Sequence, residues 1–314
     1  MSARRLGRNL ADLTGQARMS PAAISSPADA PDEIPAEATA EIPVARNGRA
    51  RVLCVTSGKG GTGKSVLTSN LSTDLARRGK KVLAVDADLG LANLHLLMGV
   101  NPRRNLYHCL SANLSFREVS ERTTAGVCLV PGPSGVAELA DLSARDLAYL
   151  IGEMGRVGSS FDLVLVDTAA GIARMTTAFL HAAREVIVVT TPDLTAMTDA
   201  YATIKTTLRH NPSALASVVV NRALSARQGW EVFQTLDGIA TRFLGRRLCY
   251  LGYLPDDDTV RRSVAAKVPA VLLEPESAVA LRVREISEIL VPPERAAEDF
   301  PFVDDSPVQE GRPR

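Results

Sequence analysis

The 314-residue sequence has few cysteines, few lysines and no long apolar run. Its four cysteines, Cys54, Cys109, Cys128 and Cys249, form no CxxC pair, which argues against both a disulfide scaffold and a zinc ribbon. We therefore interpret them as isolated reduced thiols, as expected in a reducing cytoplasm. No stretch approaches the roughly 20 apolar residues that span a bilayer. Because residues 1–19 also lack the apolar core of a signal peptide, the sequence predicts a soluble, cytoplasmic protein.

Neither sign of charge dominates the chain. The 36 Lys and Arg residues nearly balance 35 Asp and Glu residues, so the formal net charge is +1. This balance gives no global electrostatic argument for a nucleic-acid, membrane or acidic partner. The hydrophobic fraction of 46% and the charged fraction of 23% are ordinary for a globular protein.

Composition divides the chain into three parts. Residues 1–50 are rich in alanine, proline, serine and acidic residues, and we expect a mostly disordered tail there, with a short helix near residues 6–13. Residues 51–291 carry the apolar patterns of one folded domain. Residues 292–314 form an acidic, proline-containing stretch that we expect to be a disordered C-terminal tail.

Short, nearly continuous apolar runs alternate with helical patterns in the central domain. Runs typical of strands buried on both faces occur at residues 52–55, 82–85, 127–130, 163–166, 186–189, 218–220 and, more weakly, 248–253. Helical periodicity occurs at residues 65–77, 144–156, 175–183, 196–208, 226–243 and 277–290. This alternation predicts an α/β fold in three layers, a mostly parallel twisted sheet with helices on both faces.

A glycine-rich loop between the first strand and the first helix carries the clearest chemical signal. It has the form GxxxxGK[ST], which is typical of a P-loop NTPase, and its residues are Gly58, Lys59, Gly60, Gly61, Thr62, Gly63, Lys64 and Ser65. Glycines allow backbone amides to turn toward phosphate oxygens. We expect Lys64 to contact the β- and γ-phosphates of ATP and the Ser65 hydroxyl to bind Mg²⁺. Only six lysines stand among the 36 basic residues, yet this loop holds two of them.

Carboxylates follow two of the predicted strands. Asp86 and Asp88 come after residues 82–85, and two residues apart on an extended chain point the same way. Asp167 ends the apolar run 163–166, which is the Walker B arrangement for a carboxylate near magnesium-bound water. The alternative interpretation is that these aspartates only cap the end of a strand or form a turn.

The second lysine of the loop points to a particular family. The string from Lys59 to Ser65, KGGTGKS, resembles the deviant phosphate loop of MinD/ParA-type ATPases. The resemblance implies an ATP-dependent homodimer in which Lys59 reaches the partner subunit's phosphates. It also implies that Asp88 polarises the attacking water, and that Asp86 and Asp167 hold the Mg²⁺ shell together with Ser65.

The same resemblance assigns two switch glycines and a base pocket. The switches contain Asp88, Gly90 and Gly171. The adenine-contacting residues implied by the resemblance are Asn221, Arg222, Pro255 and Asp256.

Several stretches resemble the flagellar number and placement regulators called FlhG or FleN. They are residues 86–94, 189–192, 198–201 and 204–205. This resemblance implies a slow ATPase switch with a protein partner, an FlhF-like GTPase. In this family a short N-terminal motif stimulates the partner GTPase, and residues 15–19 resemble this motif only weakly. Related proteins attach peripherally to the inner membrane face through a basic C-terminal helix, whereas the last helix here carries several glutamates and favours packing on the sheet.

Other functions on the same fold stay open from the sequence. A ParA-type partition ATPase would bind DNA through a basic face, for which Arg242, Arg246, Arg247, Arg261 and Arg262 are the candidates. A MinD-type division-site regulator shares all of the loop chemistry. An iron–sulfur carrier would need paired cysteines, and a metabolic ligase or kinase would need an acceptor site that the sequence does not reveal.

Overall fold

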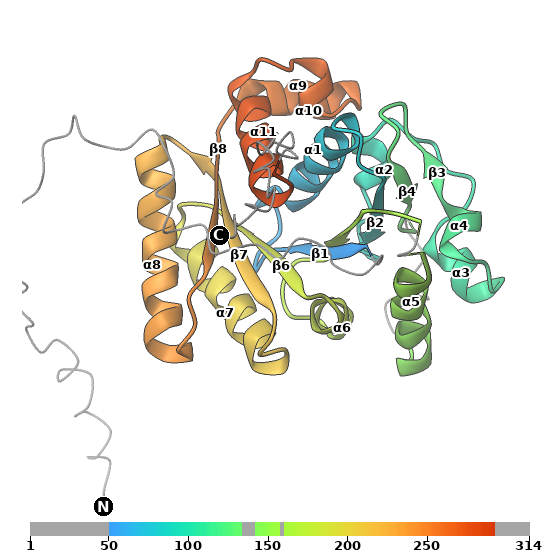
Figure 1. Cartoon of the computed structure of the whole chain (residues 1–314), viewed down its shortest axis with the longest axis horizontal. Coiled ribbons are helices and arrows are strands. Elements are labelled where there is room, and N and C mark those ends of the chain that lie inside the picture. Colours follow the sequence, from blue (N-terminus) through green and yellow to red (C-terminus); the bar gives the residue numbers. More distant parts are fainter. Residues whose placement is uncertain (1–49, 134–141, 158–159, 293–314) are drawn as a thin grey trace, which may run out of the picture. The chain divides into compact units, whose positions relative to one another are not determined.

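The computed structural model describes residues 50–133, 142–157 and 160–292 (Figure 1). The strands are β1 (Arg51–Thr56), β2 (Val82–Ala87), β3 (Glu121–Arg122), β4 (Cys128–Val130), β5 (Leu163–Thr168), β6 (Glu185–Thr190), β7 (Leu215–Ala223) and β8 (Cys249–Pro255). The helices are α1 (Lys64–Arg77), α2 (Leu94–Leu97), α3 (Leu106–Ser111), α4 (Phe116–Val119), α5 (Ala144–Val157), α6 (Arg174–Ala182), α7 (Leu194–His210), α8 (Ala226–Leu244), α9 (Asp258–Ala266), α10 (Ala270–Leu273) and α11 (Ala278–Leu290). The predicted helix near residues 6–13 and nearly all of both predicted tails lie outside the described residues.

The strands form one eight-stranded sheet in the order β3-β4-β2-β5-β1-β6-β7-β8. Seven strands run parallel, and β3 pairs antiparallel with β4 at one edge. Every residue of β2, β5 and β6 is buried, as expected for strands covered on both faces. The predicted α/β architecture is confirmed.

Helices cover both faces of the sheet. On one face α1, α2, α10 and α11 pack with a core that includes Leu67, Leu71 and Ile286. On the other face α3 to α8 pack with a second core that includes Phe116, Phe179 and Phe233. The sheet thus separates two apolar clusters, which is the three-layer arrangement of doubly wound proteins.

The loops that follow the central strands meet at the carboxyl ends of the parallel strands, which we call the carboxyl edge of the sheet. Strand β1 lies between β5 and β6, and the chain proceeds from β1 toward β2 on one side and from β6 toward β7 on the other. Ligands of such sheets bind at the carboxyl ends of the strands, where the order of the strands diverges. The glycine-rich loop leaves β1 at this point.

Helix α11 buries the apolar side chains that a membrane-binding helix would expose. Val279, Val283, Ile286 and Leu290 are at most 2% exposed, and the helix packs against α1 and β8. The packing prediction for this helix is confirmed. Among the described residues, no helix combines the length and apolarity needed to cross a bilayer, and all four cysteines are free thiols.

Candidate functional site

The glycine-rich loop turns directly into α1. Gly61 and Gly63 have φ of +80° and +96°, a region that side chains other than glycine rarely adopt. Gly63 is the N-cap residue of α1, so the first amides of the helix and its positive dipole end face the same side as the loop. This arrangement is suited to a phosphate group.

The two lysines of the loop occupy different environments. Lys64, the first residue of α1, is 9% exposed, and its Nζ lies 3.9 Å from Oδ2 of Asp88. Lys59 is exposed, and its Nζ donates to Thr195 Oγ1 of α7 at 3.4 Å. The Lys64 ammonium is therefore buried inside the site, and the Lys59 ammonium is exposed at its entrance.

Two carboxylates are buried side by side between β2 and β5. Asp86 and Asp167 are register partners and at most 1% exposed. Burial, and then the neighbouring Asp167 carboxylate, raises the pKa of Asp86 to about 8. Burial raises the pKa of Asp167 to about 6, although the Lys64 ammonium opposes this shift. Such a pair favours a nearby cation, which would offset the repulsion.

Backbone amides orient the first of these carboxylates. Asp86 Oδ2 accepts from the Leu94 amide at 2.9 Å, and its Oδ1 accepts from the Asp88 amide at 3.3 Å. Asp88 Oδ1 in turn accepts from the Leu91 amide at 3.1 Å, one residue beyond the predicted switch glycine Gly90. The loop after β2 is thus folded around its own two aspartates.

Hydroxyl groups from α1 reach the second carboxylate. The Ser65 side chain hydrogen bonds to Asp167, which lowers the pKa of that carboxyl. The Thr68 hydroxyl lies 3.3 Å from Asp167 Oδ1 and 3.0 Å from the Lys64 carbonyl. The predicted pair of Ser65 and Asp167 is therefore brought together, with Thr68 as an additional partner.

The loop after β5 is tied to the start of the glycine-rich loop. The Gly171 amide donates to the Ser57 carbonyl at 2.8 Å, and Gly171 has φ of +84°. Gly171 therefore lies beside the residue that precedes Gly58.

The residues predicted to contact adenine lie at the ends of β7 and β8. Asn221 Nδ2 donates to the Thr62 carbonyl at 2.7 Å, and its Oδ1 accepts from the Arg222 amide, where φ is +56°. Pro255 is the register partner of Ala223. The next residue, Asp256, is exposed and lies 4.0 Å from Arg261. Asn221, Arg222 and Pro255 thus meet at one edge, and Asn221 also holds the glycine-rich loop.

Some contacts at the site could not be predicted from the pattern of the sequence. A Cβ on Gly58 would lie 2.1 Å from the backbone carbon of Asp199, so α7 requires glycine there. A Cβ on Gly132 would lie 2.8 Å from the Asp86 carbonyl. Thr68 could have been found from the sequence, because it lies one helical turn after Ser65.

The donor set fits a magnesium-bound polyphosphate. It combines the amides at the N-terminus of α1, a buried ammonium and two buried carboxylates that favour a cation. A further buried hydroxyl, Thr62 Oγ1, has no hydrogen-bond partner among the described residues. Magnesium usually binds through one or two carboxylates together with substrate phosphates, which suits this arrangement.

Comparisons with known proteins agree on one family. The model for the CobQ/CobB/MinD/ParA nucleotide binding domain matches residues 53–270. The antiactivator FleN of Pseudomonas aeruginosa is 36% identical over 238 residues, which cover 76% of this chain and 85% of FleN. The flagellum site-determining protein YlxH of Helicobacter pylori is 35% identical over 246 residues, which cover 78% of this chain and 83% of YlxH.

A solved structure extends the agreement to the fold. The septum site-determining protein MinD of Pyrococcus horikoshii, complexed with Mg-ADP, matches with a TM-score of 0.67 at 26% identity. The match covers 77% of this chain and 96% of that protein. The glycine-rich loop and the carboxylates described above lie within the matched family domain.

Proposed function

Because the chain belongs to the CobQ/CobB/MinD/ParA family of nucleotide-binding ATPases, we propose that it is a MinD-like switch that regulates flagellar number or placement. In this proposal it forms a homodimer on Mg-ATP, hydrolyses ATP slowly and then separates. The observation that carries the flagellar assignment is its similarity, at 36% and 35% identity over most of the chain, to FleN and YlxH.

Each residue of the site has a proposed role. Residues 58–65 hold the triphosphate, with Lys64 beside the β- and γ-phosphates. Asp88 orients the attacking water. The contact between Asp88 and Lys64 is lost when the nucleotide binds, because Lys64 then contacts the phosphates. Asn221, Arg222, Pro255 and Asp256 surround the base, since the Asn221 carbonyl oxygen keeps a second lone pair for the adenine amine.

Magnesium would be held by the Ser65 hydroxyl and, through water, by Asp86 and Asp167. The ion supplies charge neutralisation for the phosphates when bound. The raised pKa values of the two buried carboxyl groups support this assignment, because a cation restores the charged form.

The dimer face in this proposal is the carboxyl edge of the sheet. Exposed apolar side chains follow four strands at this edge: Leu91, Ile172, Leu194 and Leu224. Large exposed apolar residues gathered around one site are typical of an interaction surface. Exposed Lys59 stands at the same edge, where it reaches the partner subunit's phosphates and stabilises charge in the transition state.

The proposed cellular setting is the cytoplasm, with peripheral attachment to the inner membrane face through a protein partner such as an FlhF-like GTPase. Burial of the apolar face of α11 favours a protein partner over direct insertion of this helix into lipid.

DNA partitioning is less well supported as a function. Four of the five arginines considered for a basic face are engaged with carbonyl or carboxylate groups: Arg246 with Pro212, Arg247 with Asp237, Arg261 with Asp258, and Arg262 with Glu274. Fewer free guanidinium groups leave less charge for releasing counterions from DNA.

Three single variants test the ATPase switch. Lys64→Ala removes the buried ammonium, so ATP binding measured by calorimetry should be lost. Lys59→Ala should retain more of the binding but show weaker ATP-dependent dimerisation in sedimentation velocity. Asp88→Ala should bind ATP, lose turnover and accumulate as a dimer. Equal loss of binding in both lysine variants would remove the cross-subunit role of Lys59.

The flagellar role is tested separately in the native organism. Flagella are counted by electron microscopy in a strain without the gene, and again after it is complemented with the wild-type or the Asp88→Ala chain. A changed count that only the wild-type chain restores is expected. An unchanged count and placement would refute the flagellar role while leaving the ATPase assignment intact.

A further inference from the structure

An apolar pocket lies at the amino ends of the strands, on the side of the sheet opposite the phosphate loop at their carboxyl ends. We call this side the amino edge of the sheet. The pocket has a volume of about 420 Å³, and its apolar lining includes Leu83, Phe116, Val157 and Phe161. Leu83 is the second residue of β2, and Phe161 stands just before β5, so the pocket opens at the amino ends of these strands. It is therefore separate from the proposed nucleotide site.

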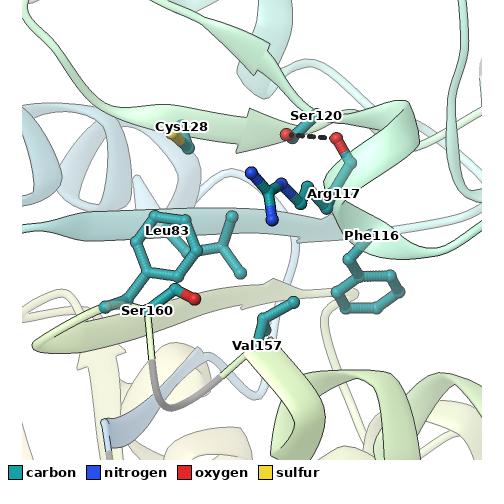
Figure 2. Close-up of a pocket in the computed structure, with 8 residues that line it drawn as sticks. Leu83, Phe116, Arg117, Ser120, Cys128, Val157 and Ser160 are labelled. Carbon is teal, nitrogen blue, oxygen red and sulfur yellow. Dashed lines mark hydrogen bonds between the residues drawn. The ribbon is translucent and has the colours of Figure 1, made fainter.

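A positively charged side chain spans this apolar lining. Figure 2 shows Arg117 of α4 extending across the pocket toward Leu83. Its guanidinium has no hydrogen-bond or ion-pair partner among the described residues. Arg122 of β3 lies close enough to Cys128, another lining residue, to lower the pKa of its thiol against the effect of burial. The pocket thus combines apolar walls with unpaired positive charge.

From these features we infer that the pocket binds the acidic, aromatic segment of residues 298–305 of this same chain. The segment reads Glu-Asp-Phe-Pro-Phe-Val-Asp-Asp and contains no basic residue. It holds two of the seven phenylalanines of the chain, Phe300 and Phe302. Residues two apart point to the same side of an extended chain, so both rings can enter the apolar lining while the flanking carboxylates meet Arg117 and Arg122.

The chain leaves the described fold close to the pocket. The last residue of α11, Leu290, accepts through its carbonyl from Arg51 Nη1 at 2.6 Å. The Arg51 amide in turn donates to the carbonyl of Asp162 at 3.0 Å, next to Phe161 in the pocket lining. The exit point and the pocket therefore share the amino edge of the sheet.

The connecting residues are long enough for this path. From β1 to β4 there are three strand spacings, about 14 Å, and crossing from the α11 face to the other face adds about 10 Å. The eight residues from 293 to 300 span up to about 26 Å when extended. Docking within one chain is thus geometrically allowed.

Alkylation of Cys128 in the full-length chain tests the inference. This thiol lines the pocket and is half-buried, whereas the other three cysteines are buried. In the double variant Phe300→Ala/Phe302→Ala we expect Cys128 to react with iodoacetamide about tenfold faster, as read by peptide mass spectrometry, which corresponds to about 1.4 kcal/mol of lost docking. Phe243→Ala, on the exposed end of α8, is the matched control and should leave the rate unchanged.

Arg117→Glu gives a second, independent reading. The added negative charge disfavours the Cys128 thiolate, so the charge itself cannot account for a faster reaction, whereas loss of the docked segment does. Thermal unfolding of each variant checks that the fold is kept. Rates equal to wild type in both the phenylalanine and the arginine variants would overturn the inference.

A cysteine scan distinguishes docking within one chain from docking between copies. With oxidised glutathione added as the oxidant, Phe302→Cys should form a disulfide with Cys128 in the monomer several times faster than Gln309→Cys, which lies outside the segment and corrects for random encounter. Equal rates for the two positions would contradict specific docking. A disulfide that joins two chains, at a rate proportional to concentration, would assign the pocket to a second copy and refute the proposal.

Discussion

Gly58 and Gly60 lie two residues apart in the phosphate loop, but the structure constrains them differently. A Cβ on Gly58 would overlap the backbone of α7 at Asp199, whereas a Cβ on Gly60 would meet nothing within 4 Å. Gly60 also has no positive φ. Of these two glycines, only Gly58 limits how closely the loop approaches α7.

This contrast predicts different costs for the same substitution. Gly58→Ala should lower the free energy of unfolding by at least about 2 kcal/mol, because the clash is with backbone that cannot rotate away. Gly60→Ala is the matched control and should change stability by less than about 0.5 kcal/mol. Chemical denaturation of both variants checks the prediction, and similar costs would mean that the loop can move away from α7.

At the scale of elements, α11 is a structural helix whose two faces differ. Ile286 is 1% exposed, whereas Leu281 is 38% exposed. The buried face contacts α1, which begins inside the phosphate loop. Packing of α11 thus supports the helix whose N-terminus forms part of the site.

Two alanine variants separate the faces of α11. Ile286→Ala should destabilise the fold by roughly 2–5 kcal/mol, through lost burial and the cavity it leaves. Leu281→Ala should cost much less, since its side chain is partly in solvent. Urea denaturation gives both values. If Leu281→Ala proved the more destabilising, the assigned orientation of α11 would be wrong.

The ends of α6 and α7 meet through two histidines. The rings of His181 and His210 are 4.6 Å apart between centroids, and His181 Nε2 is buried without a partner among the described residues. Burial, and then the neighbouring His210, lowers the pKa of His181 below its usual value of 6.5. Protonation of His181 therefore opposes the packing of the two helices.

The sign of the pH dependence follows from this shift. A base whose pKa is lower in the folded state binds fewer protons when folded, so the contribution of His181 to the free energy of unfolding falls as pH decreases below about 6.5. The raised pKa values of Asp86 and Asp167 contribute the opposite slope, so the His181 contribution is measured as the difference between the wild type and a histidine variant. His210→Gln removes the second ring and should make this dependence shallower. His108→Gln, on α3, is the control. An unchanged slope between pH 7 and 5 in His210→Gln would exclude the pair as its source.

At the scale of the whole molecule, the two edges of the sheet have different characters. The carboxyl edge carries the proposed nucleotide site and four exposed apolar side chains that follow four different strands. The amino edge carries the apolar pocket and the point where the chain leaves α11. A dimer formed through the carboxyl edge would leave the pocket accessible.

Charge placed on the carboxyl edge should weaken the proposed dimer. Leu194→Asp and Ile172→Asp each put a carboxylate where an apolar contact is expected, and like charges would face each other across a two-fold axis. In an Asp88→Ala background with Mg-ATP, sedimentation velocity should show more than about tenfold weaker association, the effect of 1.4 kcal/mol. Phe243→Asp, exposed on α8, should associate normally. Loss of dimer in Phe243→Asp alone would place the interface elsewhere.

The sequence determined the strands, the longer helices and the phosphate loop. Buried strands such as β5 appear as unbroken apolar runs, and long helices such as α8 repeat their apolar positions over several turns, so local patterns suffice. The loop is recognisable because glycines, a lysine and a serine must stand at fixed spacing to surround a phosphate. Short elements such as α2, α10 and β3 escaped prediction because four residues or fewer cannot show a period.

Only the tertiary structure decided which distant residues meet. Asp86 and Asp167 become neighbours through strand pairing, and their raised pKa values come from mutual burial rather than from sequence. The contact of Asn221 with Thr62 spans 159 positions of the chain. The requirement for glycine at position 58 comes from α7. Such contacts depend on how elements pack, and a one-dimensional pattern carries no record of packing.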